Sequence, residues 1–264
     1  MPGISVSKIP IPFNKGGGIS WSSYWKTLKA AMTTPPSAEY EVAADTFIRA
    51  LDTGGVWSKL DFLYVFAAET NGGGEALLNW VNPGTYNGLL VNAPAFTVNA
   101  GFKGDGSSSY INTQFNPSTA GGKFSLNSAS MGAYVNIVNT NETNTLMGSS
   151  AGNLFLSPNN NLSQFRGSLN STVDFSNKGV RSSTPQMVSV VRPNATTITT
   201  YKGATSMGDA AVNATSIPNA IIRILMCPGS SYSNAEVSMA FAGAALTQAD
   251  MTVLNNAWNA FFLT

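Results

Sequence analysis

The sequence contains no histidine and only one cysteine, Cys227, among its 264 residues. Without histidine the chain cannot form a Ser-His-Asp triad, bind a metal through imidazole or use imidazole as a general acid or base. The serine-rich stretches at 148–150 and 229–233 lack the base that would activate a hydroxyl, so we interpret them as turns. A single cysteine also excludes a disulfide within the chain, and its place in the apolar run IIRILMC predicts a buried thiol.

Charged residues are scarce as well. Lys, Arg, Asp and Glu make up 10% of the chain and leave a net charge of +1, whereas ordinary soluble domains contain about 25%. The polar surface must come from Asn, Ser, Thr and Gly, a composition more typical of a rigid exterior protein than of a metabolic enzyme. Neither the net charge nor an interleaving of basic and aromatic residues indicates a nucleic-acid partner.

The sequence has no apolar run long enough to cross a bilayer. The longest one, residues 60–68, is too short, so we expect no membrane span. The N-terminal stretch also lacks the basic start and apolar core of a secretory signal peptide. We therefore expect a soluble protein made without an export signal.

Residues 1–19 are expected to form an extended anchoring arm. Prolines break any helix in this stretch, and a run of glycines near its end adds flexibility. Ile9, Ile11 and Phe13 alternate with prolines, as in an extended docking segment. We expect these three side chains to contact a partner.

Residues 20–80 are expected to form a helical module for attachment and oligomerisation. Apolar residues recur at helical spacing after Ser20, which we predict to be an N-cap, and a second helix is expected after Ser37. A third helix, largely buried, is predicted over 56–68. We expect the tryptophans of this module to pack among the helices or against another subunit. Those expected to anchor the protein are Trp21, Trp25 and Trp57.

Residues 81–264 change to an alternating pattern with recurrent turn signals. Residues 131–138 and 145–148 are predicted to pair across NTNETN, and residues 187–192 and 196–202 are predicted to form a hairpin. Evenly spaced strands with polar turns are typical of a β-sandwich or barrel. The chain then ends in a predicted helix, for which Thr247 is the N-cap and Asp250 completes a variant of the capping box.

The stretch GFKGDGSSSY, residues 101–110, suggests either a ligand loop or a tight turn. Gly104, Asp105 and Gly106 tolerate the positive φ of a hairpin turn, and an alternating run follows them. A phosphate cradle would need the glycines to enter a helix, with a lysine next to Ser or Thr. We therefore predict a turn before a strand, and a calcium-ligand role for Asp105 is the alternative.

Three segments carry a resemblance to a known family: residues 93–118, the strand-turn-strand at 187–203, and the last strand and helix at 239–262. They resemble the laminin-G-like, concanavalin A-type jelly rolls of bacteriophage virion proteins. The helical stretches 21–37 and 54–70 look like the N-terminal module of tail or fibre proteins in such phages. The resemblance covers most of the chain and implies fold more strongly than function, because this sandwich serves lectins, hydrolases and scaffolds alike.

The fold class expected from these observations is mainly β. We expect an antiparallel, concanavalin A-like sandwich with an N-terminal helical module and a C-terminal capping helix. The resemblance implies a non-enzymatic structural protein of a phage particle, of the tail-fibre, head-fibre or spike type, that binds other virion proteins. It also implies a homo-oligomer, and a trimer follows the habits of phage fibres and spikes. No cofactor is expected.

Exposed loops at 139–144, 158–162 and 205–215 are expected to be free to contact a host surface. The first of them is interpreted as a solvated hairpin tip, and a calcium or sugar contact is its alternative role. Its candidate contact residues are Asn139, Asn141, Glu142 and Asn144.

Two alternative functions remain open. One is a carbohydrate-binding receptor-recognition module, and the other is a glycan depolymerase that assembles its acids from Glu142, Asp174 and Glu236. Hydrolases on this sandwich place two carboxylates on one face of a strand, and the acids of the sandwich part are isolated. We therefore expect no catalytic residue. Sugar-stacking aromatics must come from the tyrosines of the sandwich part: Tyr86, Tyr110, Tyr134, Tyr201 and Tyr232.

Overall fold

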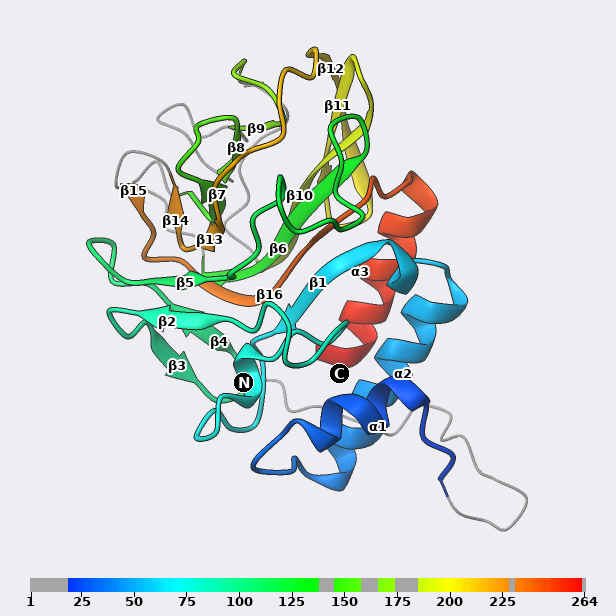
Figure 1. Ribbon diagram of the computed structural model, residues 1–264. Coiled ribbons are helices and arrows are strands. Elements are labelled where there is room, and N and C mark those ends of the chain that lie inside the picture. The colour runs from blue at the N-terminus through cyan, green and yellow to red at the C-terminus, as the bar shows by residue number, and fades with distance from the viewer. Residues whose placement is uncertain (1–18, 138–144, 158–165, 174–184, 228–230, 263–264) are drawn as a thin grey trace.

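Two antiparallel sheets packed face to face form most of the molecule, together with three helices (Figure 1). The computed structural model describes residues 19–137, 145–157, 166–173, 185–227 and 231–262. The mainly β sandwich predicted from the sequence is confirmed.

The larger sheet has eight strands and supplies one wall of the core. Seven of them lie side by side, and the eighth, β1, pairs with β16. In spatial order the seven strands are β12 (Thr205–Ala211), β11 (Thr197–Lys202), β10 (Gln186–Asn194), β6 (Ala129–Ile137), β16 (Glu236–Gly243), β4 (Gly101–Lys103) and β3 (Ala95–Thr97), and β1 covers Leu60–Val65.

The second sheet has six shorter strands and supplies the other wall. A two-stranded ribbon, β14 (Met226–Cys227) and β15 (Ser231–Tyr232), follows its strand β13. In spatial order the six strands are β2 (Leu89–Val91), β5 (Tyr110–Asn112), β13 (Ile222–Ile224), β7 (Met147–Ser149), β8 (Leu154–Ser157) and β9 (Arg166–Leu169).

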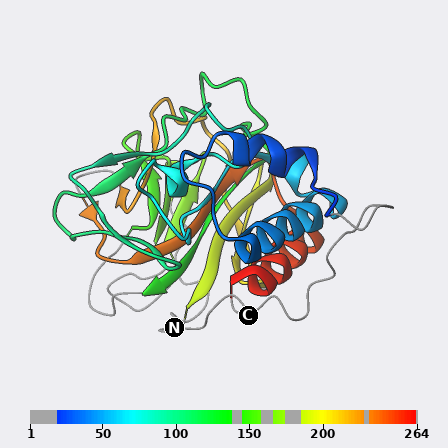
Figure 2. The ribbon, with the colours of Figure 1, turned by 90° about the horizontal axis from the view of Figure 1, so that it is seen from below.

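Three helices form a layer on the outer face of the larger sheet (Figure 2). They are α1 (Ser23–Ala30), α2 (Ala38–Thr53) and α3 (Gln248–Phe262), and short 3-10 turns cover Trp57–Lys59 and Glu75–Leu77. Between helices and sheet lies a second apolar core, in which Phe47 and Trp258 meet Phe241 of the sheet. The molecule therefore has three layers, and the larger sheet is apolar on both faces.

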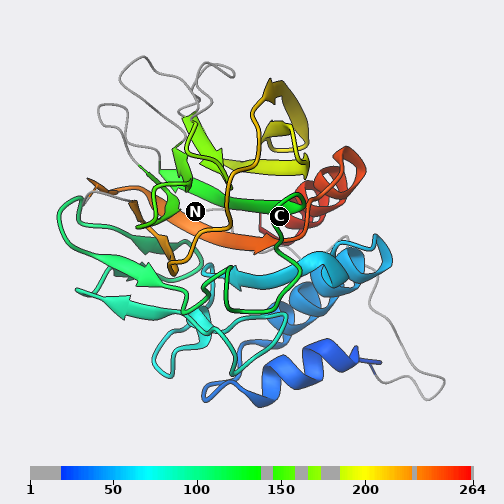
Figure 3. The same ribbon diagram turned by 45° about the horizontal axis from the view of Figure 1, so that its top comes forward.

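The prediction of a helix over residues 56–68 is wrong. These residues form a short 3-10 turn and then β1, which runs antiparallel to β16 (Figure 3). Phe62 and Tyr64 enter the core between the sheets, while Leu63 and Val65 enter the core beneath the helices. A strand buried on both faces has the same continuous apolar run as a buried helix, so periodicity could not separate the two.

The predicted pairing of residues 131–138 with 145–148 is also wrong, because those segments belong to different sheets. β6 pairs with β10 and β16 in the larger sheet, whereas β7 pairs with β8 and β13 in the second. The hairpin predicted around residue 194 is confirmed as β10 and β11, which pair from Val188 with Lys202 to Asn194 with Thr197.

The helix ends mostly follow the capping residues expected from the sequence. The Ser37 hydroxyl accepts the N–H of Tyr40 at 3.2 Å and begins α2, as predicted. At α3 the carboxylate of Asp250 accepts the N–H of Thr247 at 2.7 Å, and the Thr247 hydroxyl accepts the N–H of Asp250 at 3.2 Å. The N-cap of α1 is Ser22 rather than Ser20, so that helix begins later than predicted. In the described part of the chain, no helix has the length and apolarity needed to cross a bilayer.

Candidate functional site

The outer face of the second sheet lies on the side of the molecule away from the helices (Figure 1). The helical layer already covers the outer face of the larger sheet, and none of the described helices covers this one. Half-buried side chains on a sheet face of this kind can contact a ligand while their backbone stays rigid. Side chains that converge on this face are therefore candidate ligand contacts.

The alternation of β5 and β13 places polar and aromatic side chains on this outer face. Ile111 and Ile224 are fully buried in the core between the sheets. Their chain neighbours Tyr110, Asn112 and Arg223 therefore point to the opposite side, since successive residues of a strand face opposite ways. Arg223 lies directly across from Asn112 in the register, and all three outward residues are half-buried.

An arginine and two tyrosines meet on this face, and we call Tyr110, Arg223 and Tyr232 the Tyr-Arg cluster. The Arg223 guanidinium lies 5.3 Å from the centroid of the Tyr110 ring, within the range of a cation–π contact. The Tyr110 and Tyr232 rings are 6.4 Å apart and inclined by 41°. Pairing of β14 with β15 brings Tyr232 opposite Met226, whose sulfur lies 3.4 Å from Nη1 of Arg223.

The guanidinium of Arg223 has no carboxylate partner among the described residues. Its Nε is buried and has no hydrogen-bond acceptor there, and ion pairs between described residues lie elsewhere, as with Lys29 and Glu41. The six strands of the second sheet contain two arginines, Arg166 and Arg223, and no acidic residue. Arg223 therefore has no acidic residue on the strands of its own sheet to balance its charge.

The loop before β5 is the tight turn predicted from the sequence, and its aspartate holds the turn closed. The carboxylate of Asp105 accepts the N–H groups of Ser107, Ser108 and Ser109 at 2.8, 2.8 and 2.9 Å, and the hydroxyl of Ser108 at 2.8 Å. These donors stabilise the charged form, so they hold the pKa of Asp105 far below its usual range. Gly106 adopts a φ of 75° in the same turn.

The anchoring tryptophans expected in the helical module lie mostly inside the chain. Trp25 and Trp57 are only 1% and 4% exposed in the core beneath the helices, where Trp25 packs 6.4 Å from Trp80. The expectation that these two contact a partner is corrected, because the chain itself already buries their surface. Trp21 is half-buried at the edge of the same core, and Tyr24 beside it is 39% exposed.

The other candidate residues lie largely outside the described part of the chain. This is the case for the arm and the first loop, and for two of the three acids of the depolymerase hypothesis: Ile9, Ile11, Phe13, Asn139, Asn141, Glu142, Asn144 and Asp174. The loop at 158–162 lies outside it too, whereas 205–215 begins with β12. The third acid, Glu236, is 8% exposed at the start of β16 and accepts a hydrogen bond from Asn136 at 3.0 Å.

The five candidate tyrosines separate clearly in the structure. Tyr134 and Tyr201 lie in the core beneath the helices, and Tyr86 packs edge-on to Phe115 at 5.2 Å. Tyr110 and Tyr232 are the two that reach the outer face of the second sheet. Sequence reasoning named both but did not single out Arg223, although one arginine between isoleucines in a strand must point away from the core.

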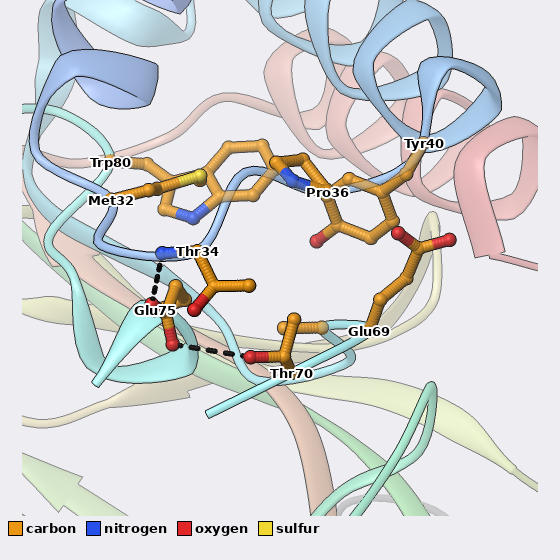
Figure 4. Close-up of a pocket in the computed structure, with 9 residues that line it drawn as sticks. Met32, Thr34, Pro36, Tyr40, Glu69, Thr70, Glu75 and Trp80 are labelled. Carbon is orange, nitrogen blue, oxygen red and sulfur yellow. Dashed lines mark hydrogen bonds between the residues drawn. The ribbon is translucent and has the colours of Figure 1, made fainter. Parts of the chain in front are cut away.

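A pocket between the loop after α1 and the start of α2 is too small for a ligand (Figure 4). It holds about 10 Å³, roughly the room of one water. Glu75 lines it and accepts the N–H of Thr34 at 2.8 Å and the hydroxyl of Thr70 at 3.3 Å. Burial acts to raise the pKa of Glu75, but these hydrogen bonds and that of the Gly73 N–H outweigh it and lower the pKa. The pocket is therefore a structural tie between two loops.

The described ranges contain no candidate metal site, because no three His, Cys, Asp or Glu side chains converge there in a way that could hold an ion. The calcium alternative at 139–144 falls outside those ranges and stays a prediction.

Comparison with known proteins shows the fold and not the family. No family model matches the sequence, and no curated protein matches it. The receptor binding domain of a botulinum neurotoxin C/D mosaic serotype superposes with a TM-score of 0.55 at 12% identity, over 75% of this chain and 51% of that one. The chain therefore spans about half the length of the toxin chains that it matches.

Two further structures have the same architecture. Domain 4 of AbnA, a GH43 extracellular arabinanase from Geobacillus stearothermophilus in complex with arabinotriose, gives a TM-score of 0.50 at 13% identity over 75% of this chain and 98% of that one. A mutant of Trypanosoma rangeli sialidase gives 0.54 at 13% identity over 84% and 40% of the two chains. At these identities the likeness establishes a β-sandwich of the jelly-roll type.

Proposed function

We propose that this chain is a carbohydrate-binding, receptor-recognition module that acts by binding and not by catalysis. The observation that carries the proposal is the Tyr-Arg cluster on the face away from the helices. Tyrosine rings present flat apolar surface to the C–H face of a sugar, and their hydroxyls, with Asn112 and Arg223, can hydrogen-bond sugar hydroxyl groups. Because the cluster lies on strands, it is positioned before a ligand arrives.

The structural neighbours support this proposal. They include a receptor binding domain, a domain in complex with arabinotriose and a botulinum neurotoxin serotype D ligand binding domain in complex with N-acetylneuraminic acid. Those ligands belong to those proteins. What they share with this chain is the sandwich, on which a small number of exposed side chains determines the ligand.

Binding to an array of glycans tests the proposal directly. We expect the full chain to bind a subset of glycans saturably, and Tyr110→Ala and Tyr232→Ala each to weaken that binding about fivefold, since loss of one aromatic contact costs roughly 1 kcal/mol. Tyr24→Ala is the matched control, because it removes an exposed tyrosine from the helical layer. If no glycan binds, or if Tyr24→Ala weakens binding as much as the cluster variants, the proposal is wrong.

We further propose that the module is carried on a phage particle, as the resemblance of the sequence implies. The helical layer, with Trp21 and Tyr24 at its surface, lies opposite the Tyr-Arg cluster, so it can face a neighbouring virion protein or sister subunit while the cluster faces outward. Several copies on one particle would strengthen a weak sugar contact through avidity. Mass spectrometry of purified phage particles, with the copy number of this protein, tests the proposed location. Absence of the protein from the particles would refute it.

A further inference from the structure

We propose, on the basis of the proposed function, that the glycan bound by this face carries a carboxylate and that this carboxylate pairs with the guanidinium of Arg223. Uronic and sialic acids are the sugars with this chemistry. The inference names the ligand class, whereas the function above requires only a sugar.

The first argument is the unbalanced charge of Arg223. Arg223 lies on the outer face of the sheet, where no described carboxylate neutralises its charge and its Nε has no acceptor in the described part of the chain. It contacts the Tyr110 ring at 5.3 Å and the Met226 sulfur at 3.4 Å. Neither carries negative charge, so these neighbours orient the cation, and no described residue supplies it with a counter-ion.

The second argument is the distribution of charge around the cluster. Neighbouring carboxylates would repel an anionic ligand, yet the strands of the second sheet contain none. Asp105, on the loop that leads into β5, is negatively charged, but its oxygens are already taken by three backbone N–H groups and a hydroxyl. On a chain with a net charge of only +1, the strands around Arg223 thus contain no acid that would repel an anionic ligand.

The third argument is geometric. An arginine guanidinium is planar and always charged, and it pairs with a carboxylate through two parallel hydrogen bonds. The Arg223 guanidinium lies over the Tyr110 ring, and the centroid of that ring is 6.4 Å from the centroid of the Tyr232 ring. A sugar ring against Tyr232 would therefore bring a carboxylate substituent within reach of Arg223.

Carboxyl reduction of the ligand provides the decisive experiment. Oligogalacturonates and sialyllactose are compared with the same compounds after their carboxylates have been reduced to hydroxymethyl groups, with the full chain and with Arg223→Gln and Arg223→Lys. We expect at least one acidic glycan to bind about tenfold or more tightly than its reduced form, since a hydrogen bond to a charged group contributes roughly 1.5–3 kcal/mol. Arg223→Gln removes this preference, and Arg223→Lys keeps part of it because the charge remains.

Lys26→Gln serves as the matched control. It removes one positive charge from an exposed residue of α1, on the helical side of the molecule, and should leave the preference unchanged. Equal binding of acidic and reduced glycans, or binding of neutral glycans alone, overturns the inference while the carbohydrate-binding function stands. A preference that Lys26→Gln lowers as much as Arg223→Gln overturns it too. Absence of binding to every glycan overturns the function itself. Thermal unfolding of each variant shows whether it is folded.

Discussion

At the scale of single residues, Arg192 has the most unusual environment. Its side chain is fully buried, and it donates from Nε to the carbonyl of Leu169 at 2.7 Å and from Nη1 to those of Val212 and Ala195 at 2.8 and 3.3 Å. Backbone carbonyls, rather than a described carboxylate, thus accept the hydrogen bonds of Nε and Nη1, while the buried Nη2 has no acceptor among the described residues. The residue ties the end of β9 to both ends of the β11–β12 region.

Arg192→Met is therefore expected to destabilise the fold by about 3 kcal/mol, because several buried carbonyls lose their donors. Urea unfolding followed by tryptophan fluorescence measures the effect. Lys26→Met, on the exposed face of α1, should change the free energy of unfolding by less than about 0.5 kcal/mol. Equal effects of the two substitutions would contradict this account.

A second residue-scale prediction concerns Asp250. Burial acts to raise the pKa of this carboxylate, but Lys59 at 2.6 Å and the N–H and hydroxyl of Thr247 outweigh it and lower the pKa. A lowered folded-state pKa means that the charged carboxylate adds stability above its unfolded pKa of about 3.9 and that this stability is lost as the pH falls through the folded value.

Asp250→Asn should therefore cost about 1 kcal/mol at pH 7, because it removes the charge that holds Lys59 and caps α3. The difference in melting temperature between wild type and variant should shrink as the pH falls below about 4. Thermal unfolding at several pH values measures it, and a difference independent of pH would show that the charge of Asp250 is not what stabilises the cap.

The site itself was only partly predictable at this scale. The sequence did not distinguish Tyr110 and Tyr232 from the three other candidate tyrosines. The pattern within a strand does not show which of its faces a helix covers in the folded chain. Arg223 was readable in principle, since a charge between two isoleucines must face outward. Its closeness to Tyr232 depends on the β14–β15 pairing, which the sequence did not indicate.

At the scale of elements, local signals predicted well and non-local ones did not. The β10–β11 hairpin and the caps at Ser37 and Thr247 arise from residues close together in the chain, and they were found. The partner of β6 was misjudged, because a jelly roll pairs strands far apart in sequence. β1 was taken for a helix because both its faces are buried.

The close approach of β1 and β16 gives a prediction at this scale. A Cβ added to Gly243 would meet the backbone of Lys59, Leu60 and Asp61, beside the register shift at the start of the pairing. Because backbone cannot yield as a flexible side chain does, Gly243→Ala should destabilise by about 2 kcal/mol or more. Gly72→Ala is the control, since a Cβ there meets nothing within 4 Å. Chemical denaturation of both variants measures this, and similar midpoints would contradict it.

At the scale of the whole molecule, the two apolar cores share a sheet. β16 is flanked by β6 on one side and by β4 and β1 on the other, so a strand from the first part of the chain completes the sheet of the last part. The change of pattern divides the sequence at residue 80, and the pairing of β1 with β16 joins the two sides of this division.

A fragment of residues 81–264 is therefore expected to be insoluble or unfolded. Without β1, the backbone groups of β16 from Met239 to Gly243 have no partner on that side, and the core beneath the helices loses α1 and α2 and keeps only α3. Expression of this fragment beside one of residues 19–264, followed by size exclusion and circular dichroism, measures the outcome. A monodisperse, cooperatively unfolding fragment would show that the sandwich is independent of β1.

The pairing of β1 with β16 also has a consequence for biosynthesis. β1 leaves the ribosome long before its partner β16, because most strands of the sandwich lie between them in the sequence. Until β16 has been made, this apolar strand has no partner in the sheet. Chaperones bind exposed apolar segments of this kind. The nascent protein therefore depends on protection until β16 emerges, and only then can both cores close.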